Sequence, residues 1–179
     1  MHTKDHYFSL RSRHQPHRIE VIFVLESPPT SGNFFYDPAG RVTEPLFSAM
    51  MKLIGYEALT KDEGLAAFAR KGFFLVDATY QPVNHIKNEK KRSRSILSDV
   101  PYLIQDLKNI IGGQRLPVKI VLVKANICRL LEEPLKANGI DVINNGRVIP
   151  FPSHGNQHKF QVNMKEVLAH NEVSFFKIS

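Results

Sequence analysis

The chain has 179 residues, of which 42% are hydrophobic, and this is enough apolar material for one globular domain with its own core. Lysine and arginine total 24 against 17 acidic residues, a formal net charge of +7, so an acidic partner such as nucleic acid is a candidate. The single cysteine, Cys128, excludes a disulfide framework and any four-cysteine metal site within the chain, and we expect it to be a small buried side chain.

Four stretches rich in Val, Ile, Leu and Phe have the length and composition of β-strands. The first three are nearly continuous apolar runs, which is typical of strands that are covered on both faces. In chain order, the predicted strands are 19–26, 72–78, 118–124 and 147–151.

Apolar residues at helical spacing lie between and after these strands. The pattern over 46–54 stops at Gly55, where the C-terminus of a helix favours glycine. A second helix is predicted to begin at Thr60, because Glu63 three residues later completes a capping box, and to end before Gly72. The remaining predicted helices are 103–111, 127–135 and one after the fourth strand.

This alternation of strands and helices predicts an α/β fold, namely a three-layer α/β/α sandwich with a central, mainly parallel four-stranded sheet. No linker or repeat divides the chain, so 1–179 is expected to be a single domain, with 1–18 as an irregular basic segment. No stretch has a signal peptide's apolar region or the length of a membrane span. We therefore expect a soluble cytoplasmic protein, associated with the nucleoid if the source is bacterial, with no membrane partner.

Polar side chains follow the predicted strands where a parallel sheet places its ligands. Glu26 ends the first strand, Asp77 ends the second, and the segment PFPSHGNQH, 150–158, follows the fourth. A carboxylate directly after the apolar run IFVL is partly desolvated, so Glu26 requires either an ion-pair partner or a catalytic function. We expect these groups to meet at one edge of the sheet.

Three segments resemble the signature segments of the uracil-DNA glycosylase superfamily: LESPPTSGNFFY, LVDA and PFPSHGN. The resemblance extends over roughly residues 19–160 and depends on the order and spacing of short motifs. It implies a monofunctional DNA repair enzyme that hydrolyses the N-glycosidic bond of a flipped uracil, or a related deaminated base, and leaves an abasic site. It also implies a monomer that acts on DNA without a cofactor or a metal ion.

The first of these segments carries the expected water-positioning and stacking groups. Glu26 corresponds to a position that orients water in the family, and Ser27 beside it belongs to the base-binding motif. Phe34 or Phe35 matches the aromatic ring that stacks on the extruded base, and we favour Phe35 for this role.

Asp77 stands where many members of the family have an Asn that reads N3 and O4 of uracil. An ionised Asp accepts a hydrogen bond from N3–H but cannot donate one to O4. Asp77 is therefore either the N3 acceptor, with Asn84 as the donor to O4, or the base that activates water. A structural alternative is that Asp77 caps the turn after its strand.

The last segment departs from the family pattern. Phe151 replaces the His that stabilises O2 of the departing base, so His154 is the candidate for that role, while Ser153 could still bind a phosphate. No Leu follows to fill the gap left by the flipped base, and Gln157 or His158 would have to do so.

A basic stretch, HIKNEKKRSRS, occupies 85–95 after the second strand. Its residues Lys90, Lys91, Arg92 and Arg94 are candidates for contact with the DNA backbone, and a solvated loop is the alternative.

Two further interpretations stay open. A catalytically silent DNA-binding protein of the same fold is suggested by Phe151 and Asp77, which replace residues of the family. A small-molecule enzyme that acts on a nucleoside or another anionic metabolite could use the same pocket. A metal pair of His154 and His158 is disfavoured, since no third ligand is evident.

Overall fold

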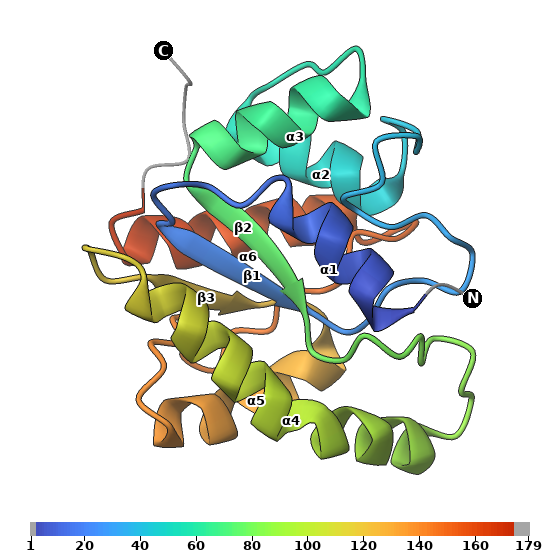
Figure 1. Ribbon diagram of the computed structural model, residues 1–179, viewed down its shortest axis with the longest axis vertical. Helices are drawn as coiled ribbons and strands as arrows, with labels where there is room; N and C mark the ends of the chain where they lie inside the picture. Colours follow the sequence, from blue (N-terminus) through green and yellow to red (C-terminus); the bar gives the residue numbers. More distant parts are fainter. Residues whose placement is uncertain (1–2, 174–179) are drawn as a thin grey trace.

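A computed structural model describes residues 3–173 and has a small parallel sheet at its centre (Figure 1). Its strands are β1 (Val21–Leu25), β2 (Phe73–Asp77) and β3 (Lys119–Leu122), in the order β2-β1-β3. The central strand is paired on both sides, with Val21 beside Phe73 of β2 and Lys119 of β3. Every residue of β1 and β2 is buried, as the continuous apolar runs predict.

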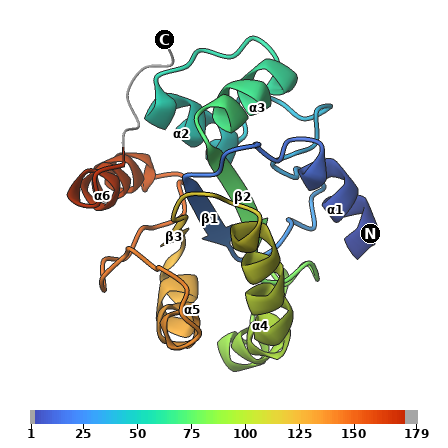
Figure 2. The same cartoon turned by 60° about the vertical axis from the view of Figure 1, so that its left-hand side comes forward.

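Six helices surround the sheet in the described part of the chain. They are α1 (Lys4–Ser12), α2 (Pro45–Ile54), α3 (Lys61–Arg70), α4 (Glu89–Gly112), α5 (Ala125–Ala137) and α6 (Gln157–His170). Figure 2 shows α2, α3 and α6 on one side of the sheet and α4 and α5 on the other. Right-handed crossovers require this division, because the chain moves from β1 to β2 in one direction and from β2 to β3 in the other.

Local sequence signals set the ends of α2 and α3 as predicted. Gly55 ends α2 with φ of 66°, a left-handed conformation that favours glycine. Thr60 and Glu63 form the expected capping box at the start of α3. The two helices pack closely at Gly64, where a Cβ atom would lie 2.4 Å from a ring carbon of Phe47.

The prediction of a fourth strand over 147–151 is wrong. The edge of β3 is instead completed by an isolated parallel bridge between Ile120 and Val142 and by the side chain of Asn144. The Asn144 amide accepts from the Leu122 N–H at 2.7 Å and donates to the Leu122 carbonyl at 3.0 Å, as a neighbouring strand would. Proline has no N–H for a β-ladder, so Pro150 disfavours strand pairing in 147–151.

The N-terminal segment also differs from the prediction, because Lys4–Ser12 of the expected irregular segment forms α1. Thr3 caps the helix by accepting a hydrogen bond from the His6 N–H. Tyr7 and Arg11 are buried against the rest of the fold. The segment is charged and has little apolar periodicity, so its sequence does not predict a helix; tertiary contacts stabilise α1.

Helix α4 is longer than predicted and includes most of the basic stretch. It begins at Glu89 because Asn88 caps it, with the Asn88 side chain accepting from the Lys91 N–H at 2.9 Å. The residues expected in a loop therefore lie in the first two turns of a helix. Pro101 is accommodated within α4, and Pro134 within α5.

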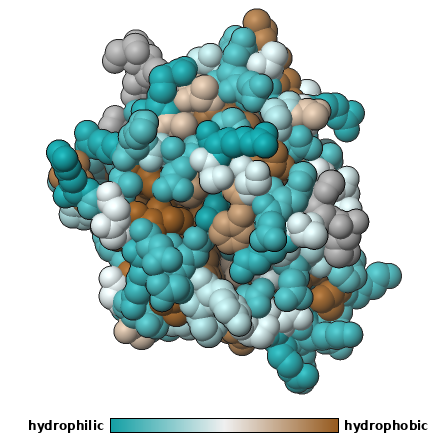
Figure 3. Space-filling model, viewed as in Figure 1, coloured by the Kyte–Doolittle hydropathy of each residue, from teal (hydrophilic) through white to brown (hydrophobic). Residues whose placement is uncertain are grey.

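The surface seen in Figure 3 is largely hydrophilic, with hydrophobic residues in small separate groups. Among residues 3–173, no helix combines the length and apolar character needed to cross a membrane.

Candidate functional site

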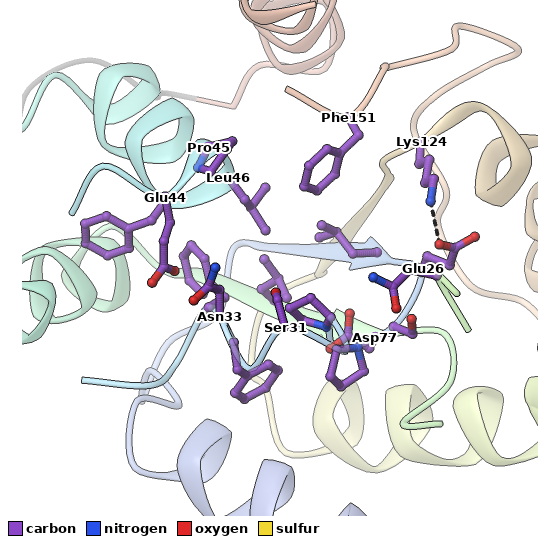
Figure 4. Close-up of a pocket in the computed structure, with 18 residues that line it drawn as sticks. Glu26, Ser31, Asn33, Glu44, Pro45, Leu46, Asp77, Lys124 and Phe151 are labelled. Carbon is purple, nitrogen blue, oxygen red and sulfur yellow. Dashed lines mark hydrogen bonds and ion pairs between the residues drawn. The ribbon is translucent and has the colours of Figure 1, made fainter. Parts of the chain in front are cut away.

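A cavity of about 280 Å³ opens at the carboxyl ends of β1 and β2. Parallel sheets place their ligands at this edge. Figure 4 shows Phe151 and Leu46 on one side of the cavity, Asp77 and Ser31 on the other, and Lys124 with Glu26 at one end. Its walls are mainly apolar, with a few polar groups, which is typical of a small-molecule site.

Asp77, the last residue of β2, is the side chain in this cavity best suited to act as a general acid or base. It is only 5% exposed, and no donor within residues 3–173 makes a hydrogen bond to its carboxylate. Burial raises the pKa of Asp77 to about 7, with the Glu26 charge adding to this effect and Arg11 opposing it. Asp77 can therefore gain or lose a proton near neutral pH, as a general acid or base must.

Helix α1 supplies Arg11, the buried cation whose charge lowers the pKa of Asp77. Arg11 donates to the Tyr80 hydroxyl at 2.7 Å and binds both oxygens of Asp106 at 2.7 and 3.0 Å. The Tyr80 hydroxyl also accepts from the backbone N–H of Asp77 at 3.5 Å. The sequence does not predict this network, because the segment that contains Arg11 lacks a clear helical pattern of apolar residues.

Glu26 follows β1 and is held by three side chains. Arg92 donates to its two oxygens at 2.8 and 2.5 Å, Asn126 donates at 2.5 Å, and Lys124 forms an ion pair with it. Burial would raise the pKa of the Glu26 carboxyl, but hydrogen bonds from Arg92 and Lys124 lower it overall. Glu26 was expected to have either an ion-pair partner or a catalytic function, and its contacts are those of a buried ion pair.

Lys124 is a site residue that sequence analysis missed. It lines the cavity two residues after the end of β3, and its backbone has φ of 88° and ψ of 133°, a conformation that is unfavourable for a residue with a side chain. Burial lowers the pKa of the Lys124 amine, and the neighbouring Arg92 adds to this, while Glu26 opposes it. The available signal was its position at the end of the predicted apolar strand 118–124, since Glu26 and Asp77 also stand at the ends of predicted strands.

Both candidate stacking rings lie in the cavity wall. Phe34 packs edge-on against Tyr7 with ring centroids 4.9 Å apart, and Phe35 packs against Phe68 at 5.2 Å. Lys61 is fully buried and fixes this segment, since its ammonium donates to the Phe34 carbonyl at 2.9 Å. The wall is therefore a fixed aromatic surface, and Phe151 from a distant segment lines the same cavity.

Ser27 and Asn84 both line the cavity and join two loops. The Ser27 hydroxyl accepts from the Val83 N–H at 3.3 Å, and the Asn84 side-chain oxygen accepts from the Thr30 N–H at 3.2 Å. The Asn84 amide nitrogen has no acceptor within residues 3–173 and can donate to a ligand.

The fold does not bring the rest of the predicted site into the cavity. Four residues near the start of α6 are exposed and do not line it: Ser153, His154, Gln157 and His158. Three basic residues on α4 are exposed as well: Lys90, Lys91 and Arg94. Of the predicted basic set, Arg92 alone is partly buried, through its bonds to Glu26.

Within the described residues, no group of three or more His, Cys, Asp or Glu side chains is arranged to hold a metal ion. Neither a scan against protein-family models nor a search of curated proteins finds a match to this chain.

Proposed function

We propose that this protein is a DNA glycosylase of the uracil-DNA glycosylase type, in a three-layer α/β/α fold, that hydrolyses the N-glycosidic bond of a flipped base. One observation carries the proposal: Asp77 is buried in an aromatic-walled cavity at the carboxyl ends of parallel strands, and no donor among residues 3–173 bonds to its carboxylate. A carboxyl group in such surroundings is poised for proton transfer. This assigns the role of base to Asp77, while Glu26 is the ion-pair partner of Arg92 and Lys124.

The cavity suits a single base. Its volume of about 280 Å³ lies just below the range of ~300–1,000 Å³ for small-molecule pockets. Phe34 or Phe35 offers a stacking face, and the free amide nitrogen of Asn84 offers a donor for a carbonyl on the base edge. A base inside a duplex must leave the stack to enter, which costs a few kcal/mol.

In the proposed reaction, ionised Asp77 accepts a proton from the attacking water as its oxygen bonds to C1′ of the sugar. The C1′–N bond breaks, and its electron pair leaves with the base. The Asp77 carboxylate also stabilises the positive character that develops on the sugar. Asn84 donates to the leaving base, in the role for which His154 was considered.

A DNA partner is supported by charge. The chain carries a net charge of +7, and Lys90, Lys91 and Arg94 are exposed on the first two turns of α4. The same turns carry Arg92, which is bound to Glu26 at the edge of the cavity. These cations can therefore contact phosphates while a nucleotide occupies the cavity.

Single-turnover excision from end-labelled oligonucleotides tests the proposal, with one uracil in single-stranded DNA or opposite G or A, followed by alkali cleavage of abasic sites. We expect wild type to cleave, Asp77→Asn to be slower by ~10²- to 10⁴-fold, and the exposed control Asp141→Asn to be unaffected. Full activity in Asp77→Asn would refute the assignment of the base. Binding without excision by wild type would favour the catalytically silent alternative.

The DNA partner is tested by the salt dependence of binding. Neutralising Lys90, Lys91 and Arg94 together should weaken binding and flatten its dependence on salt, whereas the exposed control Lys108→Gln should not. An unchanged slope would remove α4 from the interface.

A small-molecule enzyme that hydrolyses a free nucleoside is the second candidate. It is favoured because the residues predicted to bind a phosphate and to fill the gap left by the base, Ser153, Gln157 and His158, do not line the cavity. Hydrolysis of free deoxyuridine or its monophosphate without excision from DNA would identify this function.

A further inference from the structure

Lys124 has no role in the hydrolysis proposed above, yet it lines the cavity that contains Asp77 (Figure 4). Its side chain is 31% exposed, so the amine is partly desolvated but reachable from solvent. A primary amine is a nucleophile once it loses its proton, and it reacts with carbonyl carbons. The cavity therefore combines a carboxyl group and an amine.

The backbone of Lys124 is held in a conformation that favours glycine. Its φ of 88° is maintained by two hydrogen bonds: the N–H donates to the Ile149 carbonyl at 2.7 Å, and the carbonyl accepts from the Cys128 N–H at 3.0 Å. Residues in such conformations persist only where the surrounding structure imposes them, and they cluster at active sites. The position thus directs a long amine-bearing side chain from the end of β3 into the site.

The contacts of Glu26 allow Lys124 to become neutral. Glu26 is bound by Arg92 through two hydrogen bonds and by Asn126 through one, in addition to Lys124. If Lys124 loses its proton, the buried carboxylate therefore keeps Arg92 as a cationic partner and Asn126 as one further donor. Burial lowers the pKa of the Lys124 amine, and Arg92 adds to this, which is how desolvation and a second cation activate lysine nucleophiles.

We propose that Lys124 forms a covalent imine with the C1′ aldehyde of an abasic deoxyribose in DNA, an inference that rests on the proposed glycosylase function because this sugar is its product. The Nζ lone pair bonds to C1′ of the ring-opened sugar. The aldehyde oxygen leaves as water with the two amine protons, and one proton from solvent gives the charged imine. The enzyme would then be bifunctional, with hydrolysis by Asp77 followed by covalent capture by Lys124, and would depart from the monofunctional enzyme that the family resemblance implies.

The charged imine acidifies the hydrogens on C2′ of the sugar. The Asp77 carboxylate accepts one of these protons, the C–H electron pair forms a double bond, and the C3′–O bond breaks with its electrons on the 3′-phosphate. This β-elimination cleaves the DNA strand, and water then releases Lys124 by hydrolysing the imine. The sequence of steps needs no oxidant, reductant or metal.

Borohydride trapping on an abasic oligonucleotide prepared in advance tests the inference, because hydride addition to C1′ of the imine yields a stable secondary amine. The full-length chain is incubated with the oligonucleotide and sodium borohydride, and the cross-linked fraction is measured on a denaturing gel. We expect a wild-type adduct that mass mapping assigns to the peptide with Lys124. Lys124→Arg, which keeps the cation but forms no such imine, should reduce the adduct at least tenfold. The exposed control Lys108→Arg should not change it.

A second variant keeps the test valid if Lys124→Arg folds poorly. Lys124→Gly removes the amine and relieves the positive φ, so it should remain folded by circular dichroism and form no adduct. Absence of a wild-type adduct, or an adduct that persists in both variants, would overturn the inference.

Parallel excision from uracil-containing DNA separates the two proposals. Excision without trapping would refute the role of Lys124 and leave the glycosylase function in place. Trapping at Lys124 without excision of uracil would support the covalent step and refute uracil as the base.

Discussion

Replacing Asp77 by Asn should stabilise the protein while it slows catalysis. The pKa of Asp77 is about 7 in the folded protein against 3.8 for an ordinary aspartate. Since each tenfold change in proton affinity is worth about 1.4 kcal/mol, ionised Asp77 destabilises the native state by roughly 4 kcal/mol. The neutral amide of Asn removes this penalty.

The sign of the pH dependence follows from proton binding. Between pH 3.8 and about 7, the native state holds a proton on Asp77 that the unfolded chain has lost, so wild-type stability falls as pH rises. The gain in the free energy of unfolding of Asp77→Asn over wild type should therefore be close to zero below pH 4, grow through this window and reach its full value above pH 8. The wild-type excision rate should rise with pH through about 7, because the base must be ionised.

Urea unfolding of wild type and Asp77→Asn, followed by circular dichroism at intervals from pH 4 to pH 9, measures the difference directly. The exposed Asp141→Asn variant is the control and should show no such pH-dependent difference. If Asp77→Asn were less stable than wild type at pH 8, or if the difference did not grow with pH, the account of Asp77 as a buried carboxylate without a partner would be wrong.

Three further substitutions probe the packing and charges around the site, all by urea unfolding at pH 7. Glu26→Ala should lower the free energy of unfolding by about 2–4 kcal/mol, because it leaves two partly buried cations without their carboxylate. Glu89→Ala breaks an exposed pair and should lower it by less than about 1 kcal/mol. Equal losses in the two variants would contradict this reasoning. Lys61→Met should lose about 3–5 kcal/mol, since it leaves a buried carboxylate unpaired, and a loss below about 1 kcal/mol would show that the pair is not formed. Gly64→Ala should lose about 1–3 kcal/mol through overcrowding, while Gly112→Ala, with open space around its Cβ position, should be neutral or gain up to about 1 kcal/mol. The reverse order for the two glycines would refute the close packing of α2 and α3.

The local parts of the fold were predictable because their causes are local. Three buried strands appear as continuous apolar runs, and the capping box at Thr60 and the stop at Gly55 are each encoded within a few residues. The convergence of Glu26 and Asp77 also followed from the order of strands and helices, since parallel strands end at one edge. These features need no knowledge of distant contacts.

The parts that were missed depend on contacts between distant segments. Helix α1 forms around Arg11, whose partner Asp106 is 95 residues away, and the fourth strand is replaced by the side chain of Asn144. The contacts of Glu26 lie 66, 98 and 100 residues along the chain, at Arg92, Lys124 and Asn126.

The sequence by itself therefore determined the class of fold and the edge of the sheet where chemistry is expected. Only the tertiary structure decided which carboxylate is paired and which is free. Glu26 follows the central strand β1, next to Lys124 after β3 and Arg92 in the first turn of α4, and these cations compensate its charge. Asp77 lies on the outer strand β2, where no donor from the described residues bonds to its carboxylate and burial raises its pKa to about 7.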